Sequence, residues 1–159
     1  RMKSEYHVAT VARAYRAALD ALARDGATYQ FDARWLGELL AVSHRPFSTG
    51  FAFGYPESDP ASLQAPNHPV SDCVLVGYVD NVDEGRLMVR VKNPFRPGDE
   101  LEWIGPGEAG GDFEVDAIWD LDGEALDRTI SATVVQVAVK ASGNAALPLI
   151  GGIIRRRVA

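Results

Sequence analysis

The sequence is poor in the residues that build disulfides and metal centres. Its 159 residues include one cysteine, Cys73, and three histidines, His7, His44 and His68. One cysteine rules out an internal disulfide and most thiolate metal sites, and the histidines lack ligand spacing. No apolar run approaches the roughly 18–20 residues that span a bilayer, and the N-terminus lacks a signal-peptide core. We therefore expect a cytoplasmic chain without membrane contact that holds no metal or other cofactor itself.

Positive charge is also scarce. Sixteen Lys and Arg stand against 22 Asp and Glu, a net charge of −6, which argues against a general polyanion binder. The distribution is uneven: residues 1–50 hold seven basic and five acidic residues (+2), whereas residues 51–159 hold nine and seventeen (−8). The break falls near four prolines, which disfavour regular structure. We expect a helical segment and joint over residues 1–53, a proline-rich linker over 54–71 and a second domain over 72–159.

Two amphipathic helices are predicted before the linker. The first runs from the N-cap Ser4 to about Arg24 and ends at Gly26; the second runs from the N-cap Asp32 to Val42. The apolar stripe of the first contains Val8, Val11, Ala12, Tyr15, Ala18, Leu19 and Leu22, and its Arg13 and Arg16 should face water or a partner. Two helices cannot enclose a core alone. Their stripes must pack on the following domain, on a second copy, or on a region that this chain lacks.

Six short strands are predicted after the linker, at 73–79, 86–92, 100–104, 113–119, 133–139 and 150–156. In the second strand the apolar residues point to one side, and Arg86, Met88, Arg90 and Lys92 point to the other. Turn signals separate the strands, and no helical pattern lies between them. We predict a mainly β fold: a small closed antiparallel β-barrel preceded by two helices. The sequence 105–110 matches GxGxxG, but a strand pattern follows it, which favours a hairpin loop over a nucleotide site.

Two segments combine residue types that bind ligands. The segment 42–51 contains His44, Arg45, Phe47 and Thr49, whose guanidinium and aromatic groups suit an anion or a nucleobase. The segment 91–99 places Arg96 in a basic and aromatic loop. A structural joint and ordinary turn chemistry account for the same residues. These five are our candidate substrate-binding residues. We expect no catalytic residue, because no nucleophile and base pair or metal set can be assembled.

Three blocks of this sequence resemble the U32 peptidase family, the collagenase-like proteases. They are the N-terminal Arg1–Ser4 with Val8–Arg16, the block Val42–Phe51 that closes with Phe53-Gly54, and Asn93–Glu102. The blocks occur in the family's order and cover both parts of the chain. Near the end, Gly152 stands where the family pattern has an aspartate.

The resemblance implies a longer parent protein. Family members have a TIM-barrel-like catalytic region, in which several bind an iron–sulfur cluster through four cysteines, and a C-terminal barrel similar to translation-factor barrels. This chain would hold only the closing helix of the catalytic region, the joint and the C-terminal barrel, without catalytic or cluster-ligating residues. Family activities include peptidases and prephenate-dependent hydroxylases of tRNA or ribosomal RNA.

The expected role is therefore a non-catalytic accessory domain of a U32-type peptidase. It would position a protein or peptide substrate or stabilise the parent catalytic domain. One alternative is an RNA-binding module of a U32-type tRNA or rRNA hydroxylase. Another is a purely structural module, with homo-oligomers formed through the N-terminal helix.

Overall fold

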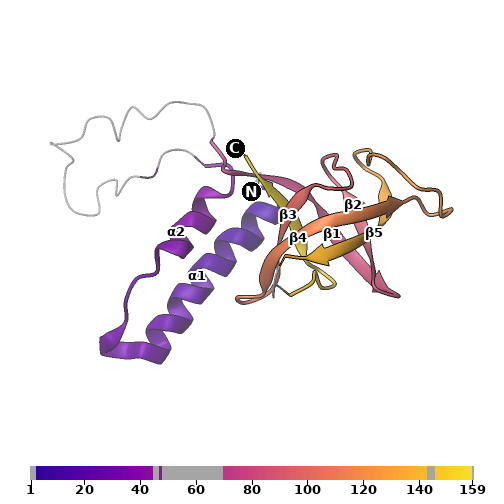
Figure 1. The fold of residues 1–159 in the computed structure, drawn as a ribbon. Helices are drawn as coiled ribbons and strands as arrows, with labels where there is room; N and C mark the ends of the chain where they lie inside the picture. Colours follow the sequence, from indigo (N-terminus) through magenta and orange to yellow (C-terminus); the bar gives the residue numbers. More distant parts are fainter. Residues whose placement is uncertain (1–2, 45–46, 48–69, 143–145, 159) are drawn as a thin grey trace.

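The computed structural model describes residues 3–44, 47, 70–142 and 146–158. Helix α1 (Glu5–Asp25), the 3-10 turn η1 (Gly26–Thr28) and helix α2 (Ala33–Leu40) form a hairpin. This hairpin projects from a barrel of six strands (Figure 1). The predicted linker lies outside the described residues except for its last two positions. No helix in these ranges combines the length and apolarity needed to cross a membrane.

Both helices begin where the sequence predicts. The hydroxyl of Ser4 accepts a hydrogen bond from the His7 amide at 3.2 Å, and the carboxylate of Asp32 accepts one from the Arg34 amide at 2.8 Å. Gly26 ends α1 with a φ of 52°, a conformation that favours glycine. Helix α2 ends at Leu40, two residues before the predicted end, because the chain turns there and buries Val42 against the barrel.

The barrel is closed and antiparallel, as predicted. Its strands are β1 (Cys73–Asp83), β2 (Arg86–Val91), β3 (Glu100–Ile104), β4 (Gly110–Trp119), β5 (Val134–Ala141) and β6 (Ile153–Arg157). They follow one another around the barrel in the order β1-β2-β5-β4-β3-β6, and every neighbouring pair is antiparallel. Each strand has two paired neighbours, so the closed barrel leaves no open edge.

Several predicted strand limits were wrong. The limits of β2 and β5 and the end of β6 differ by one or two residues, and three differences are larger. Strand β1 continues to Asp83 because its second part pairs with β2 as far as Asp83 and Arg86. Its first part pairs with β6. Strand β4 begins at Gly110 instead of Phe113, because Gly110 and Gly111 pair with the end of β3. Strand β6 begins at Ile153 instead of Ile150, because the chain first turns through Gly151, with φ 80°, and Gly152.

Gly152 fits a turn with no room for a side chain. Its amide donates to the Leu149 carbonyl at 2.8 Å. A β-carbon at this position would lie 2.8 Å from that carbonyl oxygen and 3.3 Å from the Trp103 ring. Gly152, which stands where the family pattern has an aspartate, therefore lets this turn lie close to the core, where a side chain would not fit.

The barrel interior is filled by large apolar side chains, among them Trp103, Phe113 and Ile154. Phe95, from the connection between β2 and β3, is also buried there. Its amide donates to the Thr129 hydroxyl at 2.9 Å, and the Thr129 amide donates to the Phe95 carbonyl at 2.9 Å. The block Asn93–Glu102 thus contributes to the structure by holding Phe95 in the core.

A second apolar cluster joins the hairpin to the barrel. Its buried members are Tyr6, Val42, Tyr78, Ile104 and Ile153. The Tyr6 hydroxyl donates to the Ala41 carbonyl at 3.0 Å, which ties the start of α1 to the end of α2.

The predicted apolar stripe of α1 packs on the barrel only in part. Val11 of the stripe packs against the cluster that joins the hairpin to the barrel. Val8, Tyr15 and Leu19 of the stripe are each about three-fifths exposed. The following domain therefore covers only one side of the stripe.

Candidate functional site

The junction between hairpin and barrel is built around one buried arginine. Arg155 of β6 is 2% exposed and donates four hydrogen bonds to two carboxylates. Two go to Glu38 of α2, at 3.0 and 2.8 Å, and two go to Glu102 of β3, both at 3.0 Å. Arg13 of α1 lies 3.3 Å from Glu38. We call these four residues the junction network, and it connects both helices to β3 and β6.

Arg155 and Glu102 keep their charges at neutral pH. Burial alone would lower the pKa of Arg155, but hydrogen bonds and charge from Glu38 and Glu102 outweigh burial and raise it. Burial likewise raises the pKa of Glu102, while the hydrogen bonds and charge of Arg155 bring it below the usual value of 4.5. An ionised carboxylate and a fixed guanidinium do not exchange protons near pH 7. The junction network therefore fits a structural connection and not acid–base chemistry.

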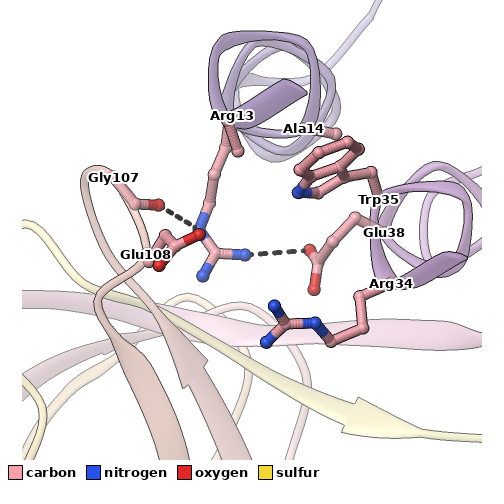
Figure 2. Close-up of a pocket in the computed structure, with 8 residues that line it drawn as sticks. Arg13, Ala14, Arg34, Trp35, Glu38, Gly107 and Glu108 are labelled. Atoms are coloured by element: carbon pink, nitrogen blue, oxygen red, sulfur yellow. Dashed lines mark hydrogen bonds and ion pairs between the residues drawn. The ribbon is translucent and has the colours of Figure 1, made fainter. Parts of the chain in front are cut away.

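A hollow of about 120 Å³ lies beside the junction network, between α1, α2 and the β3–β4 loop (Figure 2). It is lined by Arg13, Trp35, Glu38, Gly107 and Glu108, among others. Arg13 reaches across it, and its Nε donates to the Gly107 carbonyl at 2.8 Å. Ligand pockets usually enclose about 300–1,000 Å³. This hollow is smaller than that range, and the Arg13 side chain spans it.

Two predictions about this region have different outcomes. Arg13 does not face water: its side chain is only 17% exposed and lies between the helices and the barrel. Residues 105–109 form the hairpin loop that the sequence predicts, and Gly110 is the first residue of β4. The loop carbonyls at Gly107 and Ala109 accept hydrogen bonds from Arg13, the reverse of the amide donors that a phosphate site requires.

A basic and aromatic surface covers the outside of β2. Arg86 and Arg90 lie on the outer side of β2, with Met88 between them, and Lys92 follows the last residue of the strand; all three cations are exposed. The Arg86 guanidinium lies 4.1 Å from the ring centroid of Trp119, whereas Arg90 and Lys92 lie 5.0 and 5.8 Å from that of Tyr78. We call Arg86, Arg90 and Lys92, with these two rings, the β2 basic stripe. Stacking on rings fixes long cationic side chains that would otherwise move freely in water.

The neighbours of the β2 basic stripe partly offset its charge. Arg90 pairs with Asp80 at 3.1 Å, while the partner of Arg86 is neutral, the Gln136 side-chain oxygen at 3.2 Å. The outer face of β4 is acidic, with Asp112, Glu114 and Asp116 exposed. The outer face of β2 is thus basic and that of β4 acidic, although the net charge of the whole chain is −6.

The predicted site residues lie in two separate parts of the fold. His44 forms an antiparallel bridge with Val70, and its ring stacks on Phe47 with centroids 4.7 Å apart. Arg45 and Thr49 lie outside the described residues. Arg96 is exposed in the β2–β3 connection, where its amide donates to the Asp99 carboxylate at 3.0 Å. Substrate binding by these residues stays a prediction. Among the described residues, no three His, Cys, Asp or Glu side chains are grouped to hold a metal ion.

The comparisons with known proteins match both parts of the chain. Residues 71–147 match the C-terminal domain of peptidase family U32, and residues 1–61 match the peptidase family U32 model itself. The tRNA hydroxylation protein P1 of Bacillus subtilis (strain 168) is 35% identical over 129 residues, which are 80% of this chain but only 30% of that relative.

Two solved structures are also similar to the chain. One is the C-terminal domain of a Geobacillus thermoleovorans protein assigned to the U32 peptidases, at 32% identity and a TM-score of 0.45, covering 54% of this chain and 92% of that one. Its selenomethionine variant matches with the same identity and TM-score over 53% and 99% of the two chains. Because two models of one family match the helical segment and the barrel in succession, the chain belongs to peptidase family U32 and carries the C-terminal domain of that family.

Proposed function

We propose that this chain is a non-catalytic module that helps to hold tRNA for a U32 protein that modifies it, and that the β2 basic stripe contacts the RNA. Support comes from a relative named for tRNA hydroxylation that aligns over 80% of the chain. The chain spans only 30% of that relative, so the modification chemistry itself belongs to the proposal. The observation that carries it is a group of three exposed cations, Arg86 and Arg90 on β2 and Lys92 just after it, each of which lies over an aromatic ring.

The geometry of the β2 basic stripe suits a nucleic-acid backbone. Arg90 lies near the end of β2 and Lys92 two residues further along the chain, so the two cations can each reach a different phosphate group. A base can stack on the outer side of the Arg86 guanidinium, whose inner side lies over Trp119. The acidic face of β4 repels RNA and so restricts how the RNA can approach. With three cations, binding should be weak and depend strongly on salt.

The other expected roles have less support. A peptide substrate remains a prediction, since the relative that covers most of the chain is named for tRNA hydroxylation and not for proteolysis. An iron–sulfur cluster in a parent protein likewise remains a proposal drawn from the family. A structural role is favoured by one observation, the exposed stripe of α1, and that stripe is treated separately below.

A salt titration of tRNA binding tests the proposal. The chain should bind an unmodified tRNA transcript at 50 mM salt, and log Kd against log salt should have a slope of about 1.4 to 1.8 for the two phosphate contacts of Arg90 and Lys92. Arg86→Gln/Lys92→Gln should weaken binding by removing one stacking contact and one phosphate contact, and it should lower that slope by about 1. The matched control is Arg24→Gln/Arg128→Gln, which removes two exposed cations elsewhere.

Two results would refute the proposal. One is the absence of tRNA binding at 50 mM salt. The other is an equal loss of affinity in both double variants, which would show that only net charge matters. Circular dichroism of both variants should match the parent chain, because all four side chains are exposed.

A further inference from the structure

The hairpin of α1, η1 and α2 presents large apolar side chains that its own barrel leaves exposed. On α1, Val8, Tyr15, Leu19 and Leu22 are 59%, 61%, 59% and 47% exposed. Phe31, just before α2, and Leu36, on α2, are 64% and 43% exposed. Single exposed apolar residues are ordinary on protein surfaces, but a contiguous helical stripe of four marks an interaction site. We call these six residues the hairpin apolar surface.

Helix α1 is apolar on two nearly opposite sides. At about 100° per residue, its four exposed apolar residues fall within roughly 60° of one another. Its buried residues Tyr6, Thr10, Ala14 and Ala21 centre roughly 140–150° away around the helix. A helix with apolar residues on opposite sides is typical of one that lies between two layers of a protein. The described residues supply one of these layers, formed by α2 and the barrel.

A groove of about 330 Å³ extends this surface onto the barrel. It runs between α1 and the loops that lead out of β3 and into β6, and it is lined mainly by apolar residues, including Ala9, Ala12, Ile104 and Pro106. Gly151 also lines it, and the two residues before Gly151, Leu149 and Ile150, are 56% and 61% exposed. Apolar side chains are therefore exposed on the hairpin and on the turn before β6, and the groove between α1 and the barrel also has Arg13 and Arg16 in its lining.

The hairpin is held to the barrel firmly enough to present this surface in one orientation. Arg13 and Glu38 fix α1 and α2 to the β3–β4 loop and to Arg155 of β6. The cluster around Tyr6 and Val42 seals the same junction. A partner that binds the hairpin therefore also positions the barrel.

We propose that the hairpin apolar surface and the adjoining groove dock the remaining part of the U32 region in a longer protein. Residues 1–61, which include the whole hairpin, match the U32 family model, whereas the barrel matches a different one. The aligned residues make up only 30% of the relative's length, so in a protein of that size most of the mass lies outside this chain. The occupant is an apolar face of that region. This inference is independent of RNA binding by the β2 basic stripe.

Thiol labelling tests the proposal. Cys73 is 7% exposed, so a cysteine introduced at Leu19 can be followed with little background in the 159-residue chain, and the longer protein without the substitution gives the background to be subtracted there. Leu19→Cys should react rapidly in the 159-residue chain and at least about 100-fold more slowly in a longer protein that contains the complete U32 region, since only rare opening would expose it there. The matched control is Glu114→Cys on the outer face of β4, which should react equally in both proteins.

Two outcomes would overturn the proposal. Equal reactivity of Leu19→Cys in both proteins would show that the U32 region does not cover the stripe. Protection that rises with the concentration of the 159-residue chain, together with a sedimenting dimer that Leu19→Ser abolishes, would assign the surface to a second copy instead.

A pair of serine substitutions covers the case in which the labelled protein does not fold. Tyr15→Ser/Leu19→Ser should leave the urea midpoint of the 159-residue chain unchanged, because both side chains are exposed there. The same change should lower the melting temperature of the longer protein by several degrees. Equal effects on both proteins, or no effect on either, would contradict the proposal.

Discussion

Replacing Arg155 with methionine should lower the free energy of unfolding of the chain by about 3 kcal/mol. The substitution keeps most of the side-chain volume and removes the charge. Breaking a buried ion pair costs about 3–5 kcal/mol, because the remaining partner stays buried without compensation. We take the lower end of this range because Glu38 and Glu102 keep 19% and 16% of their side-chain exposure. Arg13 and Arg157 also remain within 3.3 and 3.6 Å of these carboxylates.

The loss of unfolding free energy in Arg155→Met should become smaller as the pH falls. Glu102 has a depressed pKa in the folded chain, so its ionised form contributes stability above the ordinary carboxyl pKa. That contribution is lost as the pH falls through the folded pKa. Arg155→Met removes the cause of the depression, so the difference between variant and parent should be largest near pH 7 and shrink below about pH 4.

Urea denaturation followed by tryptophan fluorescence measures both effects, because Trp103 is fully buried. The control is Arg128→Met, an exposed cation whose replacement should change stability by less than about 0.5 kcal/mol. A cycle with Glu38→Gln should give a coupling energy of about 1–3 kcal/mol with Arg155→Met. A loss below about 1 kcal/mol at pH 7, or an equal loss at pH 4, would refute this account of the junction network.

Three further substitutions test other parts of the fold. Gly152→Ala should cost about 1–3 kcal/mol in thermal unfolding because its β-carbon meets a backbone oxygen, whereas Gly37→Ala, with open space in α2, should be neutral or stabilising. Thr129→Val should cost about 1–3 kcal/mol in urea, because the buried Phe95 amide loses its acceptor; an unchanged midpoint would contradict that role. Burial raises the pKa of Tyr6 from 10.0 to about 12, so the parent chain should lose stability between pH 10 and 12 more steeply than Tyr6→Phe; parallel pH curves would refute this.

The sequence carried most of the information about local structure. Ser4 and Asp32 are helix caps, and their side chains mark both helix starts because few other residues satisfy the first amides of a helix. The alternation of residues 86–91 in β2 correctly separates the core side from the outer side, since strand side chains alternate strictly. Closure was also predictable, because six short strands need protected edges. The pairing of β2 with β5 had no comparable local signal.

The junction network escaped prediction for a physical reason. Glu38 and Arg155 are 117 positions apart, and the residues around each of them do not indicate that its charge is buried. Arg13 lies between apolar positions of an amphipathic helix, where a charged residue usually faces water. In contrast, the alternating cations of β2 were visible as one outward row. Their stacking on Tyr78 and Trp119 depends on strand register, which the sequence does not show.

The two family matches meet near residues 61–71. The hairpin before this point and the barrel after it nevertheless share an apolar cluster and an ion-pair network. A truncation placed there would uncover the outward side of Tyr78 and Ile153, which Tyr6 and Val42 now shield. It would also leave Arg155 with one carboxylate where it has two. Such a fragment would expose these apolar side chains to water. The hairpin therefore forms part of the outer surface of the barrel, since it covers the outer side of Tyr78 and Ile153 and supplies one of the two carboxylates that Arg155 binds.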